Sequence, residues 1–339
     1  MIFFDTTSAS SWRHSSGLAR VSRRLLGELG ASAAGAGWPQ IAGMAGKDDW
    51  FLTPELFSEA ERPGFASFLG GRTCRLAAVY HDAIPIKHPA ITWPRSVGRH
   101  PGYMKLLARF DRVWAVSQAS RDELLGFWRW QGVPDPPPVE VLALGADGPG
   151  AGRAPVAGAR EGPPRIVATG ILEPRKNQGV LIDACEALRR EGLEMELHLV
   201  GRVNPHFGLG IRKRIAAAGK RWPGLRHHPG MGDPELAGLI RTARATAMPS
   251  IAEGCGLPLL ESLWMGVPCV CSDIAPLVEN AREGGCLVVA GNTPDGWRDA
   301  LRRVLTDDAL HARLCAEAAG RPLPTWSAAA ETLRRALSA

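Results

Sequence analysis

Two carboxylates within one short segment could hold different parts of an elongated ligand. The segment 249–261 reads PSIAEGCGLPLLE and contains Glu253 and Glu261. We expect an apolar strand to end where this segment begins and a helix to start near Leu257, because a glycine-containing loop precedes that leucine and a proline follows it. Glu253 would then lie beside the positive end of the helix, and Glu261 more than a turn inside it. Taken alone, the pattern is also typical of an N-terminal cap followed by a solvated helix glutamate.

Two adjacent cationic residues occur in a second segment, which also lies between an expected strand and an expected helix. Residues 170–177 read GILEPRKN and place Arg175 and Lys176 between an expected strand and an expected helix. Cations at the carboxyl end of a strand suit a pyrophosphate, because guanidinium and ammonium groups form charge-assisted hydrogen bonds with phosphate oxygens. Taken alone, such a pair is also typical of a solvated surface.

The second half of the chain alternates strands with helices, which is typical of a doubly wound parallel α/β sheet. Helices are expected over 177–191, where apolar residues form one stripe, and over 236–243, after an N-cap at Asp233 and a proline at the first helical position. The expected strands are 165–169, 196–200, 225–228, 246–249, 268–272 and 286–289.

The first half shows the same alternation less clearly. Helices are expected over 17–29 and 120–128, the second capped by Ser120. The expected strands are 2–6, 76–80, 112–117 and 139–144. The region 31–46 is too rich in Ala and Gly to assign to either class.

A stretch of Gly, Ala, Pro and charged residues at 145–164 cannot bury a core and predicts a linker. We therefore expect a Rossmann-like domain over 1–150, a second one over 160–322, and a C-terminal helix over 323–339 that crosses back to the first. The two domains are expected to face each other across a cleft, with ligands at the carboxyl ends of the strands.

The segment 249–261 resembles the E-x7-E signature (E-G-F-G-L-P-x-L-E) of the retaining glycosyltransferases of family four, which have the GT-B fold. The resemblance implies that Glu253 contacts a donor sugar and that Glu261 holds the ribose hydroxyls of a nucleotide. A Gly-rich turn would present N–H groups to the phosphate. That turn comprises Gly254, Cys255, Gly256 and Leu257. Cys255 stands where the family usually has phenylalanine, a departure that concerns the packing of the loop.

Other segments match the same family in order along the chain. Residues 170–177 resemble its G-x-x-x-x-R-K-N segment, which implies that Arg175 and Lys176 neutralise the diphosphate. The first domain matches more loosely: Gly17 lies in a G-x-x-R sequence beside the expected phosphate, and His81 in a V-x-H-D turn beside the sugar. The further donor-binding positions implied are Gly170, Gly201, Arg202 and Met231.

The implied activity is metal-independent transfer of a hexose, of mannose or glucose type, from a nucleotide-diphosphate sugar to a glycan or lipid-linked glycan. Bacterial polysaccharide or lipopolysaccharide assembly is the expected setting. The catalytic candidates are Glu253, His81, Arg175 and Lys176. Two alternatives stay open, a non-catalytic sugar-nucleotide-binding protein and a GT-B sugar-nucleotide epimerase. The first domain would serve the acceptor and the second the donor.

Composition narrows the expected partners and location. The 339 residues carry a net charge of +6 with no long Lys/Arg run, aromatic residues are few, and no RNA-binding signature occurs, so a nucleic-acid partner is not expected. Seven scattered cysteines without a C-x-x-C pair favour reduced thiols and a cytoplasmic location. No apolar run approaches the roughly 18 residues of a membrane-spanning helix, so contact with an inner membrane face would be peripheral. No metal-ligand pattern or cofactor motif is visible, and the nucleotide sugar is the expected donor substrate.

Overall fold

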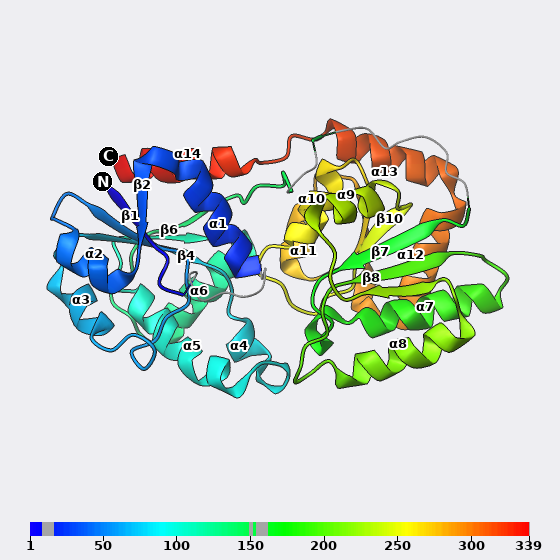
Figure 1. Cartoon of the computed structure of the whole chain (residues 1–339), viewed down its shortest axis with the longest axis horizontal. Helices are drawn as coiled ribbons and strands as arrows, with labels where there is room; N and C mark the ends of the chain where they lie inside the picture. The colour runs from blue at the N-terminus through cyan, green and yellow to red at the C-terminus, as the bar shows by residue number, and fades with distance from the viewer. Residues whose placement is uncertain (9–16, 149–151, 154–161, 339) are drawn as a thin grey trace. The chain divides into compact units, whose positions relative to one another are not determined.

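The chain divides into two compact units (Figure 1). The computed structural model describes residues 1–8, 17–148, 152–153 and 162–338. Unit 1 comprises Met1–Gly145 with Pro324–Ala339, and unit 2 comprises Ala146–Leu323. Much of the predicted linker, at 149–151 and 154–161, lies outside the described residues.

Unit 1 is built on a six-stranded parallel sheet. The strand order is β2-β1-β3-β4-β5-β6, so the chain reverses direction across the sheet between β1 and β3. In open α/β sheets such a switch point is where the strand ends leave a crevice for ligands. The strands are β1 (Ile2–Asp5), β2 (Ala33–Ala36), β3 (Trp50–Thr53), β4 (Arg75–Tyr80), β5 (Arg112–Ala115) and β6 (Val139–Val141).

Aromatic side chains fill much of the core of unit 1. Phe57 packs edge-on against Phe65 and Tyr103, with ring centroids 4.9 and 4.8 Å apart. The covering helices are α1 (Gly17–Leu29), α2 (Trp38–Met44), α3 (Phe65–Gly71), α4 (Ile84–Lys87), α5 (Pro94–Leu107), α6 (Gln118–Trp130) and α14 (Trp326–Ser338), with short 3-10 turns at Gly30–Ser32 and Pro89–Ile91.

The C-terminal helix α14 packs against α1 in unit 1 (Figure 1). The guanidinium of Arg24 lies 5.9 Å from the ring centroid of Trp326, and Arg334 donates to the carbonyl of Glu28 at 3.2 Å. These contacts place the end of the chain on the unit that contains its beginning.

Unit 2 contains a second six-stranded parallel sheet, in the order β12-β11-β10-β7-β8-β9. Its switch point lies between β7 and β10, the first and fourth strands of the unit. The strands are β7 (Arg165–Thr169), β8 (Glu196–Val200), β9 (Leu225–His228), β10 (Ala245–Met248), β11 (Cys269–Ser272) and β12 (Cys286–Val289). The predicted doubly wound parallel sheet is confirmed, and four of these strands have the predicted bounds.

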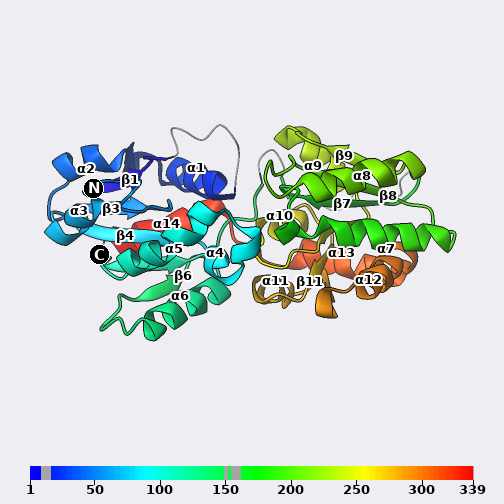
Figure 2. The ribbon, with the colours of Figure 1, turned by 90° about the horizontal axis from the view of Figure 1, so that it is seen from below.

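Aliphatic residues and two tryptophans fill the core of unit 2. Trp297 of α12 is fully buried, and α12 packs beside α7 (Figure 2). The helices are α7 (Gln178–Arg190), α8 (Leu209–Arg221), α9 (Asp233–Arg241), α10 (Leu257–Trp264), α11 (Ala275–Ala281), α12 (Pro294–Thr306) and α13 (Asp308–Gly320), with 3-10 turns at Pro174–Lys176 and Ala290–Asn292.

Two predicted caps are wrong by a few residues. Ser117, not Ser120, is the N-cap of α6, because its hydroxyl accepts a hydrogen bond from the Ser120 N–H. Asp233 is the first residue of α9 and Gly232 precedes it as the N-cap, so the acid acts through the helix dipole rather than as a cap. In the part of the chain that is described, no helix is both long and apolar enough to cross a membrane.

Candidate functional site

The two segments singled out in the sequence emerge side by side at the switch point of unit 2. Strands β7 and β10 pair in parallel, with Ala245 opposite Ile166 and Thr246 opposite Val167. Parallel pairing places their carboxyl ends at one edge of the sheet, so the loops after Thr169 and Met248 begin next to each other. The Ile251 N–H donates to the Arg175 carbonyl at 2.9 Å and joins the two loops directly.

Arg175 and Lys176 converge on the carboxylate of Glu253. Lys176 Nζ donates to Oε1, and Arg175 Nη1 donates to Oε2 at 3.2 Å and to the Ala252 carbonyl at 2.9 Å. The side chains of Lys176 and Glu253 are only 11% and 9% exposed. The structure thus brings together three of the four predicted catalytic residues.

A second carboxylate completes this cluster. Glu173 accepts from Arg175 Nε at 3.0 Å through Oε1 and from Asn204 Nδ2 at 2.8 Å through Oε2. Two cations therefore face two carboxylates, which balances the charge. Sequence reasoning missed Asn204, because it follows β8 without a motif around it. Glu173 was visible in the segment 170–177 but offered no pattern that distinguished it.

Burial and pairing set the protonation of the cluster. Burial lowers the pKa of Lys176, and the opposing effect of Glu253 does not restore it to its usual value. For Glu253, burial acts to raise the pKa, but Lys176 and Arg175 together outweigh it and hold the pKa below the usual value. The carboxylate is therefore ionised at neutral pH and available as an acceptor.

Glycines allow the strand-end turns to pack backbone against backbone. Gly170 has φ +130°, and Gly201, at the end of β8, has φ +147°. A Cβ on Gly201 would lie 2.1 Å from the Gly170 carbonyl oxygen, so no side chain fits there. These turns carry two of the predicted donor-binding positions.

The start of α10 also depends on glycine. Gly256 is its N-cap with φ +92°, and a Cβ there would lie 2.5 Å from Leu277 Cδ2. Cys255 packs against the apolar cluster that contains Leu277, and burial raises the pKa of its thiol to about 12. The thiol therefore acts as a small apolar group, in keeping with its place where the related family has phenylalanine.

Glu261 is buried within α10. The first part of the predicted linker lies close to it, since a Cβ on Gly148 would be 3.5 Å from Glu261 Cγ. Glu253 and Gly254 precede Leu257, the first residue of the helix, as the sequence predicted.

Other predicted donor-binding positions lie on the same unit. Arg202 is exposed, and its carbonyl accepts from the Leu172 N–H at 2.9 Å. Met231 is half-buried and packs against the apolar cluster under α9. In unit 1, Gly17 is the exposed first residue of α1, and the residue before it lies outside the described residues.

His81 follows β4 in unit 1 and is buried. Its Nε2 lies 2.8 Å from the Pro54 carbonyl oxygen, which can only accept, so Nε2 carries the proton and Nδ1 the lone pair. Burial lowers the pKa of His81, with the Pro54 contact and Asp82 acting in the opposite direction. Burial therefore favours the neutral imidazole at pH 7.

Among the described residues, no three His, Cys, Asp or Glu side chains gather in a geometry suited to a metal ion. Metal independence stays a prediction for experiment.

The fold and the charged cluster of unit 2 indicate the class of domain to which this unit belongs. A doubly wound sheet with cations, a glutamate and a glycine-capped helix at its switch point is typical of a Rossmann-like nucleotide-binding domain. Residues 163–307 match the family model "Glycosyl transferases group 1". The predicted resemblance to family-four glycosyltransferases is therefore confirmed for this segment.

Relatives extend the similarity beyond that segment. The chain is 29% identical over 273 residues to a D-inositol 3-phosphate glycosyltransferase of Frankia alni, covering 75% of this chain and 66% of the relative. It is 31% identical over 264 residues to the protein of that name in Corynebacterium glutamicum, covering 71% and 60%. It is also 29% identical over 259 residues to the serotype-specific mannosyltransferase WbdA of Escherichia coli, covering 68% and 29%. The chain thus spans less than two thirds of the length of these relatives.

Solved structures share the fold. Sucrose-phosphate synthase from Thermosynechococcus elongatus superimposes with a TM-score of 0.71 at 16% identity, covering 99% of this chain and 97% of that one. The UDP-forming trehalose-phosphate synthase from Burkholderia xenovorans gives 0.66 at 15% identity, covering 89% and 77%. The predicted fold class, two Rossmann-like units as in GT-B glycosyltransferases, is confirmed.

Proposed function

We propose that this chain is a retaining glycosyltransferase that moves a hexose, of mannose or glucose type, from a nucleotide-diphosphate sugar to a glycan or lipid-linked glycan. The observation that carries the proposal is the contact of Arg175 and Lys176 with Glu253 at the switch point of unit 2. The names of the relatives, which include glycosyltransferases of inositol phosphate and a mannosyltransferase, support hexosyl transfer.

The charge balance of the cluster suits the reversible binding of a diphosphate. Without ligand, Glu253 and Glu173 neutralise the two cations, which lowers the cost of keeping Lys176 buried. A bound diphosphate would share those cations. As the glycosidic bond breaks, negative charge gathers on the β-phosphate, and fixed cations beside it stabilise that charge in the transition state.

The remaining groups divide between nucleotide and sugar. Glu261 holds the ribose, and the turn at 254–257 presents N–H groups at the start of α10 to the phosphate. Glu253 contacts the sugar, and the cations hold its carboxylate in place. Unit 1 serves the acceptor, and His81 acts there as a neutral hydrogen-bonding group.

The setting of the reaction follows the same resemblance. We place the enzyme in the bacterial cytoplasm, in polysaccharide or lipopolysaccharide assembly, with peripheral contact at the inner membrane face where the acceptor is lipid-linked. The mannosyltransferase relative named for a serotype supports this setting.

A thermal-shift screen of UDP, GDP and ADP, each with its hexose conjugates, tests the proposal. A nucleotide at about 100 times its Kd stabilises the folded chain by about 2.7 kcal/mol. Release of the nucleoside diphosphate from the stabilising sugar conjugate should then be measured with an added glycan acceptor, whose hydroxyl takes the hexose. Binding of the sugar nucleotide without release of the nucleoside diphosphate would indicate a sugar-nucleotide sensor. Conversion of the sugar without that release would indicate an epimerase. Absence of nucleotide binding would refute the proposal.

A further inference from the structure

Unit 1 has a charged cluster at its own switch point. Asp5 is the last residue of β1, Thr53 is the last residue of β3, and these strands are neighbours. Glu55 follows β3 by two residues. The carboxyl ends of β1 and β3 therefore meet where the sheet topology leaves a crevice, and two carboxylates lie at that edge.

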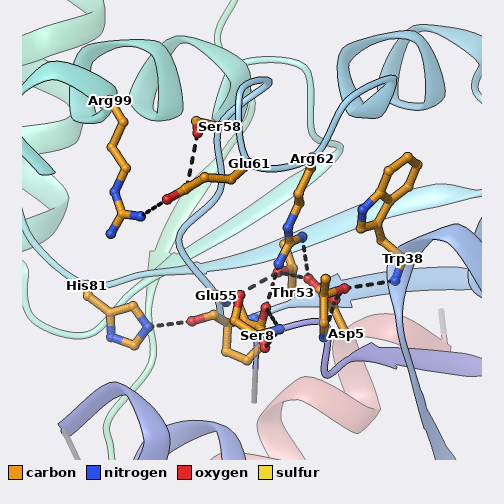
Figure 3. Close-up of polar contacts among 12 residues, drawn as sticks. Asp5, Ser8, Trp38, Thr53, Glu55, Ser58, Glu61, Arg62, His81 and Arg99 are labelled. Atoms are coloured by element: carbon orange, nitrogen blue, oxygen red, sulfur yellow. Dashed lines mark hydrogen bonds and ion pairs between the residues drawn. The ribbon is translucent and has the colours of Figure 1, made fainter. Parts of the chain in front are cut away.

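Arg62 holds both carboxylates. Its Nη1 donates to Asp5 Oδ2 at 2.7 Å and its Nη2 to Glu55 Oε2 at 2.5 Å (Figure 3). All three side chains are buried, and the guanidinium lies over the rings of Phe57 and Phe65, with centroid distances of 5.6 and 5.2 Å. The cluster is thus shielded from water.

The carboxylates in turn fix the backbone that leaves β1. Both oxygens of Glu55 accept from the Ser8 N–H, at 2.9 and 2.7 Å. Asp5 accepts from the N–H of Thr7 at 3.0 Å, and the Thr7 hydroxyl accepts from the Trp38 N–H at 2.9 Å (Figure 3). The turn 6–8 is therefore tied to α2 and to the segment after β3.

The same segment reaches His81. Pro54, between Thr53 and Glu55, supplies the carbonyl that accepts from His81 Nε2 at 2.8 Å. The position of that carbonyl depends on Glu55, because Glu55 anchors the chain immediately after it. Since a carbonyl cannot donate, this contact also selects the His81 tautomer that keeps its lone pair on Nδ1.

We propose that Glu55 is a positioning residue of the transferase, which sets through one buried segment both the turn after β1 and the orientation and tautomer of His81. This role of Glu55 rests on the proposed function and adds a residue of unit 1, outside the donor-binding unit. The contacts that carry it are those of Glu55 with Ser8 and Arg62, and of Pro54 with His81.

The charge of the cluster explains why a carboxylate, and not an amide, stands at this position. Oε2 of Glu55 accepts from Ser8 and Arg62, while Oε1 also faces the Ser8 N–H. An amide would turn one N–H group toward a donor and would leave Arg62 with a single carboxylate. Burial raises the pKa of Glu55, Asp5 adds to the rise, and the Ser8 and Arg62 contacts oppose it.

The test compares Glu55→Gln with Asp111→Asn. Asp111 is a control for the loss of a carboxylate that accepts from a backbone N–H and pairs with an arginine. It accepts from the Leu76 N–H at 2.7 Å and pairs with Arg72 at the amino ends of the strands of the same sheet, and this pair is partly exposed. Four quantities are measured: exchange of the Ser8 amide hydrogen, melting temperature, affinity for UDP or GDP, and release of that nucleotide from UDP-glucose or GDP-mannose. Turnover is normalised to the nucleotide-binding fraction.

We expect Glu55→Gln to lose protection of the Ser8 amide and to lower kcat about tenfold or more, since small misplacements of reacting groups have effects of this size. Its nucleotide affinity should stay within about twofold of the parent chain, because all the proposed nucleotide contacts except Gly17 lie in unit 2. Asp111→Asn should keep the parent kcat even if it melts earlier. Glu55→Asp, which keeps the charge, should lie between Glu55→Gln and the parent, and serves as the test if Glu55→Gln does not fold.

Parent-level kcat in Glu55→Gln, or in Glu55→Asp if only that variant folds, would overturn the positioning role and leave the proposed function intact. Equal losses of kcat in Glu55→Gln and Asp111→Asn would also overturn it, since the effect would then be one of general stability. A parent chain that neither binds nor releases a nucleotide would instead refute the proposed function, and this role with it.

Discussion

Lys176 and Glu253 are 77 residues apart in the sequence and form a buried ion pair across the switch point of unit 2. Neither side chain would be stable there alone, because an isolated buried charge is strongly unfavourable. The pair therefore keeps a cation in place at the edge of the sheet where we propose that the diphosphate binds. Arg175 adds a second cation and fixes the Glu253 loop through the Ala252 carbonyl.

Replacing either cation should weaken nucleotide binding. We expect Lys176→Ala and Arg175→Ala each to reduce the affinity for the nucleoside diphosphate about tenfold or more, because a hydrogen bond to a charged group contributes about 1.5–3 kcal/mol. Calorimetric titration measures this. Lys213→Ala, which removes an exposed cation from α8, should bind normally and controls for net charge. Unchanged affinity in both site variants would remove these residues from the donor site.

Transfer should persist in excess EDTA. Arg175, Lys176 and the start of α10 supply the positive charge that a metal ion supplies to diphosphates in other enzymes. Nucleotide release is measured with EDTA and with added Mg²⁺ or Mn²⁺. A strict requirement for either ion would contradict the proposed role of the two cations.

Gly201 should tolerate no side chain. Gly201→Ala places a Cβ 2.1 Å from the Gly170 carbonyl oxygen at φ +147°, so we expect a loss of about 1–3 kcal/mol from backbone strain and a further loss from the displaced turn. Gly219→Ala in α8 meets no described atom within 4 Å and should stabilise by about 0.5–1 kcal/mol. Denaturant unfolding of both variants measures the contrast, and equal effects would mean that the two turns are not packed as described.

The sequence predicted the two segments that meet at the switch point of unit 2, but it did not predict the charged cluster of unit 1. Strands such as β7 and β8 are apolar runs bounded by polar or glycine residues, so the segments that follow them could be placed at a strand end. The convergence of Arg175 and Lys176 on Glu253 required only that both segments follow neighbouring strands.

The Glu55–Arg62 contact depends on the order of the strands in the sheet, which cannot be predicted from the local sequence. Strand β3 is four residues long and follows two aspartates, and β2 reads AAGA without a β-branched residue, so neither was predicted. Helix α8 was missed because its many basic residues leave only a weak apolar stripe. The pairing of β1 with both β2 and β3, which brings Asp5 to Glu55, follows from the tertiary fold alone.

Stability should fall as the pH decreases from 7 toward 5. Burial lowers the pKa of His81, His100, His198 and His228 below the usual 6.5. At a pH between the pKa values of the folded and unfolded states, these histidines bind more protons in the unfolded chain. Their contribution to the free energy of unfolding is therefore complete above about pH 6.5 and is lost as the pH falls through the pKa values of the folded state. Glu55, with its raised pKa, acts in the opposite direction in acid.

His100→Gln tests this dependence, because the Gln amide can still donate to the Asp82 carbonyl that His100 Nε2 contacts at 2.8 Å. Melting temperatures at pH 7.5 and 5.5 should differ less in this variant than in the parent chain. His206→Gln, at an exposed position, should leave the difference unchanged. Parent-like behaviour of His100→Gln would mean that His100 titrates normally.

The two glutamates of the segment 249–261 should be separable by kinetics. Glu261 lies inside α10 and should act through the nucleotide, whereas Glu253 precedes the helix and should act through the sugar. A ribose contact exists in ground and transition states alike, so its loss raises KM more than it lowers kcat. A sugar contact that strengthens as the glycosidic bond breaks has the reverse effect.

We therefore expect Glu261→Ala to bind the bare nucleoside diphosphate poorly, and Glu253→Gln to bind it at least nearly as well as the parent chain but to turn over far more slowly. Removing the Glu253 charge also frees Lys176 and Arg175 for the diphosphate, so the comparison is made by calorimetry at fixed ionic strength. Glu283→Gln, an exposed carboxylate near the end of α11, controls for the loss of one negative charge. Loss of nucleotide binding in Glu253→Gln together with its retention in Glu261→Ala would reverse the two roles, so that Glu253 would hold the ribose hydroxyls and Glu261 would act through the sugar.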